Sequence, residues 1–264
     1  MPTNEEVNAT DGTAPRVIVV MPAYNAARTL ERTYADIPLD VVHDVVVVDD
    51  ASRDPTPAVA EALGLRVFVH ERNSGYGANQ KTCYREALRL GADVVVMLHA
   101  DHQYDATRIP QLIAPILEDK ADMVLGSRIV DGKALAGGMP IYKFISNRFL
   151  TTVENMVLKL QLTDLHTGFR AYSRRLLTQV PWMMNSNDFV FDSEMIVQAV
   201  SCGFRLSEIA VSARYFPEAS SVNFQVSLRY GLKTLGVLVR YLIHIATGRS
   251  NPRFLRTNGA SREM

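Results

Sequence analysis

Two acidic clusters that follow valine-rich runs are the residues of this sequence best suited to chemistry. The run at 45–48 leads into Asp49 and Asp50, and the run at 94–98 leads into Asp101. Short apolar runs of this kind are typical of strands buried on both faces of a parallel sheet, whose ligands bind beyond the carboxyl ends of the strands. One cluster suits a base or a ribose, and the other suits a divalent cation on a diphosphate. Together they indicate a nucleotide-sugar enzyme.

The segment 99–103 holds the candidate metal ligands. A Mg²⁺ or Mn²⁺ ion on a diphosphate needs few protein oxygens, and Asp101 offers a carboxylate while Gln103 offers a carbonyl. His99 is a further candidate ligand. A zinc site made of His99, Asp101 and His102 is the rival chemistry, but no open three-ligand hydrolase pattern accompanies it. We therefore expect Mg²⁺ or Mn²⁺ as the cofactor.

The first acidic cluster suits a nucleotide. The carboxylates of Asp49 and Asp50 can accept hydrogen bonds from a base edge or from ribose hydroxyls, whereas Asp54 is explained as well by helix capping. A turn at 73–79 contains Gly75 and opens a helix, so its backbone can approach an anionic ligand. This turn matches no dinucleotide or triphosphate pattern, and alone it is a weak signal.

Composition excludes several other classes. A chain of 264 residues is long enough to bury a large core, and its formal net charge of zero gives no global field that attracts nucleic acid. Cys83 and Cys202 are far apart in the sequence and predict reduced thiols rather than a disulfide. The N-terminus shows no signal-peptide pattern, so we expect a cytoplasmic location.

A parallel sheet has to position these residues, and the first half of the chain predicts one. We expect strands at 17–20, 45–48, 66–70, 94–98 and 123–125, and helices at 26–36, 57–63, 77–90 and after Asp105. The second half predicts helices at 142–160, 191–201 and 227–247, and a strand at 205–215. This alternation is typical of an α/β fold whose mostly parallel sheet is flanked by helices.

The predicted organisation has four parts. They are a polar, disordered tail at 1–14, a catalytic domain at 15–226, an amphipathic helix at 227–248 and a basic tail at 249–264.

Several short motifs occur in the order and spacing of a known family. They are Pro22-Ala23-Tyr24-Asn25, Asp49-Asp50-x-Ser52-x-Asp54, the turns at Gly75 and Asp101, Gly126-Ser127-Arg128, Thr167-Gly168-Phe169-Arg170 and Phe191-Asp192-Ser193-Glu194. Over roughly residues 15–230, the sequence resembles the family 2 glycosyltransferases of GT-A (Rossmann-like) fold. Within that family it is most similar to the dolichol- and polyprenyl-phosphate mannosyltransferase branch and its bacterial glucosyl relatives.

The resemblance implies an inverting transferase that moves a hexose from a donor such as GDP-mannose or UDP-glucose to a polyprenyl or dolichyl phosphate. It implies that the donor is contacted by Pro22, Ala23, Tyr24, Asn25, Asp49, Asp50, Gly75, Ala100 and Asp101. It also implies that Asp101 and Gln103 hold the metal. His99 stands where the family usually has the first acid of an Asp-x-Asp pair, which leaves the metal preference open.

The resemblance further implies that Arg128 and Arg170 bind the donor diphosphate or the acceptor phosphate, since arginine suits bidentate phosphate recognition. For Arg128, a surface salt bridge is an equally good interpretation. Asp192 is the candidate general base if the acceptor is a hydroxyl group, and Glu194 is expected to be structural.

The predicted C-terminal helix bears on the acceptor. Arg229, Lys233, Arg240 and His244 share one face, and leucines fill much of the rest. The charges argue against a membrane-spanning helix and favour one lying on an anionic bilayer, at the inner face of the membrane, beside an integral membrane partner. An ordinary surface helix is the alternative.

Two other functions stay open: a soluble transferase with a hydroxyl acceptor, and a non-catalytic nucleotide-sugar-binding protein, the latter suggested by His99.

Overall fold

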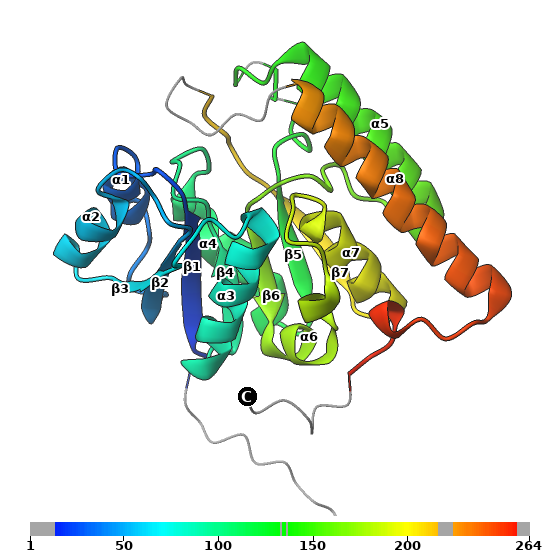
Figure 1. The fold of residues 1–264 in the computed structure, drawn as a ribbon, viewed down its shortest axis with the longest axis horizontal. Helices are drawn as coiled ribbons and strands as arrows, with labels where there is room; N and C mark the ends of the chain where they lie inside the picture. Colours follow the sequence, from blue (N-terminus) through cyan, green and yellow to red (C-terminus); the bar gives the residue numbers. More distant parts are fainter. Residues whose placement is uncertain (1–13, 133, 136, 216–223, 258–264) are drawn as a thin grey trace, which may run out of the picture.

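One sheet of seven strands forms the centre of the computed structural model, which describes residues 14–132, 134–135, 137–215 and 224–257 (Figure 1). Its strands are β1 (Val17–Ala23), β2 (Asp44–Asp49), β3 (Arg66–Val69), β4 (Val94–Met97), β5 (Met123–Ser127), β6 (Arg170–Ser173) and β7 (Leu206–Ala210). The predicted tail at 1–14 lies outside the described residues except for residue 14, and so does the end of the predicted basic tail, at 258–264.

The helices connect these strands. The α-helices are α1 (Leu30–Ala35), α2 (Thr56–Ala62), α3 (Tyr76–Arg89), α4 (Ile109–Leu117), α5 (Ile141–Leu158), α6 (Arg174–Gln179), α7 (Phe191–Ser201) and α8 (Phe224–Thr247). Three short 3-10 helices are η1 (Ala106–Arg108), η2 (Trp182–Met184) and η3 (Pro252–Phe254).

The strand order is β3-β2-β1-β4-β6-β5-β7, and every pairing is parallel except the two made by β6, which runs antiparallel to β4 and β5. β1 lies between β2 and β4, so the carboxyl ends of all three strands meet at one edge. The turns that follow β2 and β4 therefore lie on either side of the end of β1, as the sequence predicts.

Alternate side chains of each central strand enter two different cores. Val46 and Val95 pack on one face with α3, α6 and α7, whereas Val47 and Val96 pack on the other face with α1, α2 and α4. Burial on both faces explains why these strands read as unbroken valine runs. The mixed α/β architecture with a mostly parallel sheet is confirmed.

Two predicted elements are shorter in the structure. The helix expected at 26–36 begins only at Leu30. Before it, Asn25 adopts a positive φ of 53°, the Ala26 N–H donates to Thr56 Oγ1, and the Ala26 carbonyl closes a separate turn by accepting from the Thr29 and Leu30 N–H groups. The strand expected at 205–215 ends at Ala210. Beyond it the chain crosses to the turn at 99–103, where the Arg214 N–H donates to the Gln103 backbone carbonyl. The sequence did not predict β6 or α6.

Helices α5 and α8 pack side by side along the outer edge of the molecule (Figure 1). The basic face predicted for α8 is partly neutralised, because Lys233 pairs with Asp188 and Arg240 lies 3.5 Å from Glu194. Large apolar side chains are exposed instead: Leu228, Leu232, Val239, Leu242 and Ile243 on α8, and Ile141, Ile145, Phe149 and Met156 on α5. Among the described residues, no helix has the length and apolar content to cross a bilayer.

Candidate active site

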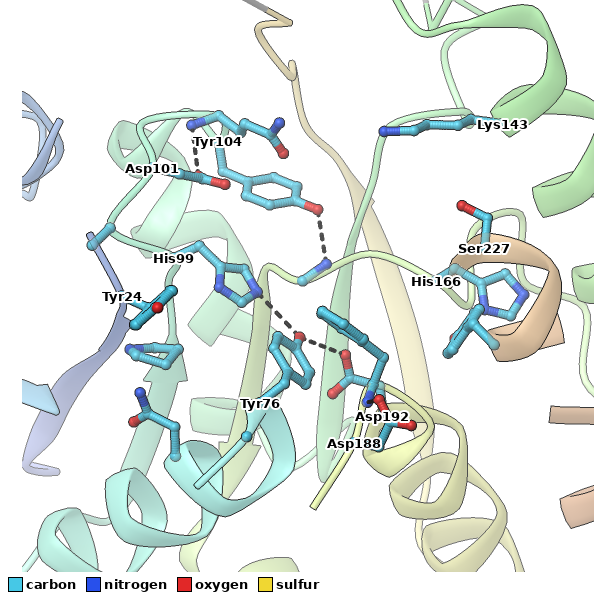
Figure 2. A pocket seen from close by; sticks show the side chains of 18 of the residues that line it. Tyr24, Tyr76, His99, Asp101, Tyr104, Lys143, His166, Asp188, Asp192 and Ser227 are labelled. Carbon is cyan, nitrogen blue, oxygen red and sulfur yellow. Dashed lines mark hydrogen bonds between the residues drawn. The ribbon is translucent and has the colours of Figure 1, made fainter. Parts of the chain in front are cut away.

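A cavity of about 830 Å³ opens beyond the carboxyl ends of β1, β2 and β4, with α5, α7 and α8 contributing its other walls. Figure 2 shows Tyr24 and Asp101 on one side and Lys143, His166 and Ser227 on the opposite side. The cavity thus has a sheet-edge end, lined by turns that follow strands, and a helical end, lined by α5 and α8.

Most of the predicted donor-binding residues line the sheet-edge end. They are Pro22, Ala23, Tyr24, Asp50, Gly75, Ala100 and Asp101. The Tyr24 side chain is 48% exposed, which leaves its ring available for stacking. Asp50 accepts hydrogen bonds from the backbone N–H groups of Ser74 (2.8 Å) and Gly75 (3.0 Å), so it also orders the glycine turn.

Two predicted donor contacts, Asn25 and Asp49, do not line the cavity. Asp49 is fully buried, and its carboxylate accepts hydrogen bonds from the backbone N–H and the hydroxyl of Ser52. Asn25 Oδ1 accepts from the Arg53 N–H at 2.8 Å. Both side chains bond within the turn after β2. Asp49 is too buried to reach a nucleotide, whereas Asn25 is exposed and its contact with the nucleotide stays a prediction.

Gly75 joins the glycine turn to the segment that precedes α7. Its φ is 98°, and a Cβ atom there would lie 2.5 Å from the Asn187 carbonyl oxygen. This turn, which is only a weak signal of ligand binding in the sequence, is therefore a site of close backbone packing. It brings the next residue, Tyr76, toward α7.

The predicted metal ligands Asp101, Gln103 and His99 all line the cavity. Asp101 Oδ1 accepts from the Gln103 N–H at 3.1 Å, and His99 Nε2 lies 3.2 Å from the Tyr76 hydroxyl. The zinc alternative is not formed, because His102 pairs with Asp36 at 3.1 Å. Within the described residues, no group of three or more His, Cys, Asp or Glu side chains gathers as a metal site. This donor set fits a cation that arrives with phosphate oxygens of its own.

Asp192, near the start of α7, lines the cavity with a carboxylate held by several donors. Its Oδ2 accepts from the Tyr76 hydroxyl at 2.8 Å, and its Oδ1 accepts from Gln80 Nε2 at 3.1 Å. Burial and the neighbouring Asp192 raise the pKa of Tyr76, so the phenol stays protonated. Since its single proton goes to Asp192, His99 Nε2 must donate to the Tyr76 oxygen. The result is a chain from His99 through Tyr76 to Asp192 (Figure 2).

Arg170 does not line the cavity. Its side chain has no exposed surface, and it donates to the carbonyl oxygens of Thr167 (2.7 Å) and Leu165 (3.2 Å) while lying 3.7 Å from the Asp192 carboxylate. Burial alone would lower the pKa of Arg170, but Asp192 and the neighbouring tyrosines together more than offset this and raise it. The prediction that Arg170 binds a phosphate is corrected, because the guanidinium has no access to a ligand. It positions Asp192 instead.

Arg128 lines the cavity and is paired in bidentate fashion with Asp164, with N–O distances of 2.8 and 3.0 Å. Asp164 is fully buried, so this is not the surface salt bridge considered from the sequence. Burial would raise the pKa of Asp164, but Arg128 and Asn147 outweigh that effect and hold it well below its usual range.

Lys143, on α5, is a second cation at the helical end of the cavity. Desolvation, followed by repulsion from Arg128, lowers its pKa. Within the described part of the chain, no carboxylate forms an ion pair with it. The two neighbouring cations share a single paired carboxylate, so this end of the cavity keeps an excess positive charge that favours an anion. The sequence reasoning missed both Lys143 and Tyr76, although Tyr76 lies next to Gly75 in a turn that had been noticed.

Comparison with known proteins agrees with this geometry. The family described as Glycosyl transferase family 2 matches residues 18–180, more than half of the chain. A dolichyl-phosphate hexose transferase of Haloferax volcanii is 30% identical, over 78% of this chain and 86% of the relative. A UDP-N-acetylglucosamine–dolichyl-phosphate N-acetylglucosaminyltransferase of Methanococcus voltae is 25% identical, over 81% of this chain and 92% of the relative.

A solved structure shares the fold. Glucosyl-3-phosphoglycerate synthase from Mycobacterium tuberculosis, in complex with Mn²⁺, UDP-glucose and phosphoglyceric acid, has a TM-score of 0.62 and 21% identity, covering 86% of this chain and 79% of that one. The chain is thus a glycosyltransferase with the GT-A fold, and it belongs to glycosyl transferase family 2.

Proposed function

We propose that this enzyme transfers a hexose, with inversion, from a nucleoside diphosphate sugar to a polyprenyl or dolichyl phosphate. The observation that carries the proposal is the pair of cations, Lys143 and Arg128, at the helical end of the cavity. Their neighbouring positive charges are compensated by one carboxylate, that of Asp164, within the described chain. An acceptor phosphate would supply the missing negative charge. The names of the two lipid-phosphate relatives support this choice of acceptor.

The donor would occupy the sheet-edge end of the cavity. Tyr24 and Asp50 would contact the nucleoside. The Asp101 carboxylate and the side-chain carbonyl of Gln103 would hold Mg²⁺ or Mn²⁺ against the diphosphate. The solved relative was crystallised with Mn²⁺ and UDP-glucose, which supports a nucleotide-sugar donor and a divalent cation in this family. A cation held there would neutralise the charge that develops on the leaving diphosphate. His99 would be able to ligate the cation only through Nδ1, because its Nε2 donates to Tyr76.

Asp192 lies between these two ends. A fully ionised lipid phosphate needs little base help, and its oxygen would attack the anomeric carbon directly. An acceptor oxygen that arrives protonated would pass its proton to Asp192, whose carboxylate Tyr76 and Gln80 hold in place. This position also keeps a second candidate function in view, namely transfer to a hydroxyl acceptor with Asp192 as general base.

The outer faces of α5 and α8 support peripheral membrane contact, which we place at the cytoplasmic face. Ile145 and Leu232 are 61% and 64% exposed, on the same two helices that carry cavity residues. A lipid acceptor lying in the bilayer would thus find its phosphate site close to the membrane surface. An integral membrane partner covering these apolar faces is the alternative occupant. Flotation with protein-free vesicles distinguishes the two, since only direct lipid contact retains the enzyme without a partner.

The experiment that tests the function measures transfer from a panel of nucleotide sugars with Mn²⁺ or Mg²⁺, with and without a short-chain polyprenyl phosphate. A sugar-lipid product made from one donor supports the proposal. Transfer only to hydroxyl compounds would select the second candidate, and no turnover with any donor would favour a nucleotide-sugar-binding protein.

A matched pair of variants tests the acceptor site. Lys143→Met should raise the KM for the lipid phosphate by about tenfold or more, as expected for the loss of a charged hydrogen bond, and leave the KM for the donor unchanged. Lys159→Met is the control, because Lys159 lies at the end of the same helix, outside the cavity. Equal kinetics for the two variants would contradict the placement of the acceptor phosphate.

A further inference from the structure

A buried acid and histidine pair lies behind the helical wall of the cavity. Glu154, on α5, has no exposed surface, and its carboxylate oxygen lies 3.1 Å from His166 Nε2. In the described part of the chain, no other donor reaches the Glu154 carboxylate, and His166 Nε2 has no other partner. A dry carboxylate without donors is costly, so the pair must hold a compensating proton.

The proton count of the pair fixes the state of the other ring nitrogen. If His166 carries the proton, it is an imidazolium and both nitrogens bear hydrogen. If Glu154 carries it and donates to Nε2, the neutral ring bears its hydrogen on Nδ1. In both of these arrangements Nδ1 is protonated. A bare Nδ1 requires either that the Glu154 acid proton stay without an acceptor among the described residues, while Nε2 bears the ring hydrogen, or that the pair lose its proton and leave a net negative charge buried; both states are costly.

Nearby charges do not change this count. Two arginines lie near this wall: Arg128, which donates to the His166 carbonyl and is paired with Asp164, and Arg170, which lies 3.7 Å from Asp192. Each is matched by its own carboxylate. Neither is therefore available to neutralise Glu154 in place of the shared proton.

The protonated Nδ1 faces Tyr230, a residue of α8 that lines the cavity together with His166. The Nδ1–OH distance is 2.7 Å. With hydrogen on Nδ1, the Tyr230 oxygen accepts this bond, so the hydroxyl proton must point elsewhere. Ser193 Oγ, at 3.2 Å, is a longer alternative acceptor that also lies 3.2 Å from Thr234. Burial, followed by the charge of Glu154, raises the pKa of Tyr230, so the hydroxyl keeps its proton.

We propose that Tyr230 binds a phosphate oxygen of the acceptor through its hydroxyl proton, and that the Glu154–His166 pair positions this hydroxyl as a donor. The inference rests on the proposed function for the identity of the acceptor. Ser227, one helical turn before Tyr230, lines the same wall, and Figure 2 shows Ser227 and His166 together at the helical end, where Lys143 also lies. Tyr230 would thus add a neutral donor to the two cations there.

The first test needs no substrate. In nitrogen-15 NMR spectra of the free protein, we expect His166 Nδ1 to be protonated at neutral pH, with the resonance assigned by its loss in His166→Asn. A bare Nδ1 overturns the inference, because Tyr230 would then donate to the histidine and not to a ligand.

The second test measures binding of a short-chain polyprenyl phosphate. Tyr230→Phe, which removes only the hydroxyl, should weaken binding about tenfold or more and raise the acceptor KM, with the donor KM unchanged. Tyr241→Phe is the matched control, because Tyr241 lies on the same helix but packs against Phe254 outside the cavity. Native-like binding by Tyr230→Phe overturns the inference. If the native enzyme binds no polyprenyl phosphate, the acceptor assignment falls with the proposed function, while the NMR result still decides the direction of the hydrogen bond.

Discussion

Replacing Asp192 by asparagine would separate its structural part from its chemical part. Arg170 has no exposed surface, and its one ion pair within the described chain is with Asp192, at 3.7 Å. Breaking a buried pair by removing one partner costs about 3–5 kcal/mol. The Asp192 side chain is 10% exposed toward the cavity, so we expect the lower end of this range, about 3 kcal/mol.

That loss is large against a typical stability of about 5–15 kcal/mol. For a chain of this size it corresponds to a fall in Tm of roughly 6–12 °C. The matched control is Glu194→Gln, two residues further along α7. The Glu194 carboxylate accepts from the Ser186 N–H at 2.6 Å and lies 3.5 Å from the half-exposed Arg240, so its change should cost about 1 kcal/mol.

The assay is equilibrium unfolding of both variants beside transfer activity at a temperature where each is folded. While folded, Asp192→Asn should lose most activity toward an acceptor oxygen that arrives protonated, because its amide cannot accept a proton, and should keep most of its activity toward a fully ionised phosphate. Combined with Arg170→Met it should show a coupling energy of about 1–3 kcal/mol, since both changes act on one pair. A stability within about 0.5 kcal/mol of native for Asp192→Asn would refute the dependence of Arg170 on this carboxylate.

Three further results are expected. Gly168→Ala should impair activity, because its Cβ would collide with the His99 ring. Gly236→Ala, where the new Cβ has nothing within 4 Å, should raise the unfolding free energy by about 0.5–1 kcal/mol, and unfolding and transfer assays of both variants check these results. Because the pKa of Asp164 is lowered in the folded protein, its ionised carboxylate stabilises the fold above the unfolded-state pKa of about 4, and this contribution is lost as the pH falls below that pKa. The unfolding free energy, measured between about pH 5 and pH 3, should therefore decline less steeply in Asp164→Asn than in the native protein. Chelation of divalent cations should abolish turnover, and addition of Mn²⁺ or Mg²⁺ should restore it. The Tm of the donor-free protein should not change on chelation, because Asp101 and Gln103 alone are too few ligands to hold a cation, and a shift in that Tm would contradict this.

The sheet edge could be predicted from the sequence because its signals are local. Each valine run forms its own strand, and the acid that follows it is carried to the edge by the run itself. Asp101 and Asp50 reach the cavity for this reason. Because the pattern is local, it did not distinguish Asp50, which lines the cavity, from its neighbour Asp49, which does not. Adjacent side chains of an extended segment point in opposite directions, and one of them faces its own turn.

The other end of the cavity depends on contacts that no local pattern contains. Tyr76 and Asp192 are 116 positions apart and meet because the glycine turn packs against the segment before α7. Arg170 looked like a phosphate ligand, but it lies on β6, the antiparallel strand that the sequence did not predict. Inserted between β4 and β5, that strand is central in the sheet, and its arginine is buried with a carboxylate for a partner.

Helix α8 shows how one amphipathic pattern can serve three surfaces. Successive residues of a helix step by about 100°, so Tyr230, Leu232 and Lys233 face the cavity, the outside and the segment before α7 in turn. The basic residues look suited to an anionic bilayer in the sequence, yet Lys233 is bound to Asp188 and Arg240 lies beside Glu194. These ion pairs fix the helix against the catalytic core. The apolar stripe is then left on the outside without a partner among the described residues, and it, rather than the charge, is the surface that a membrane would recognise.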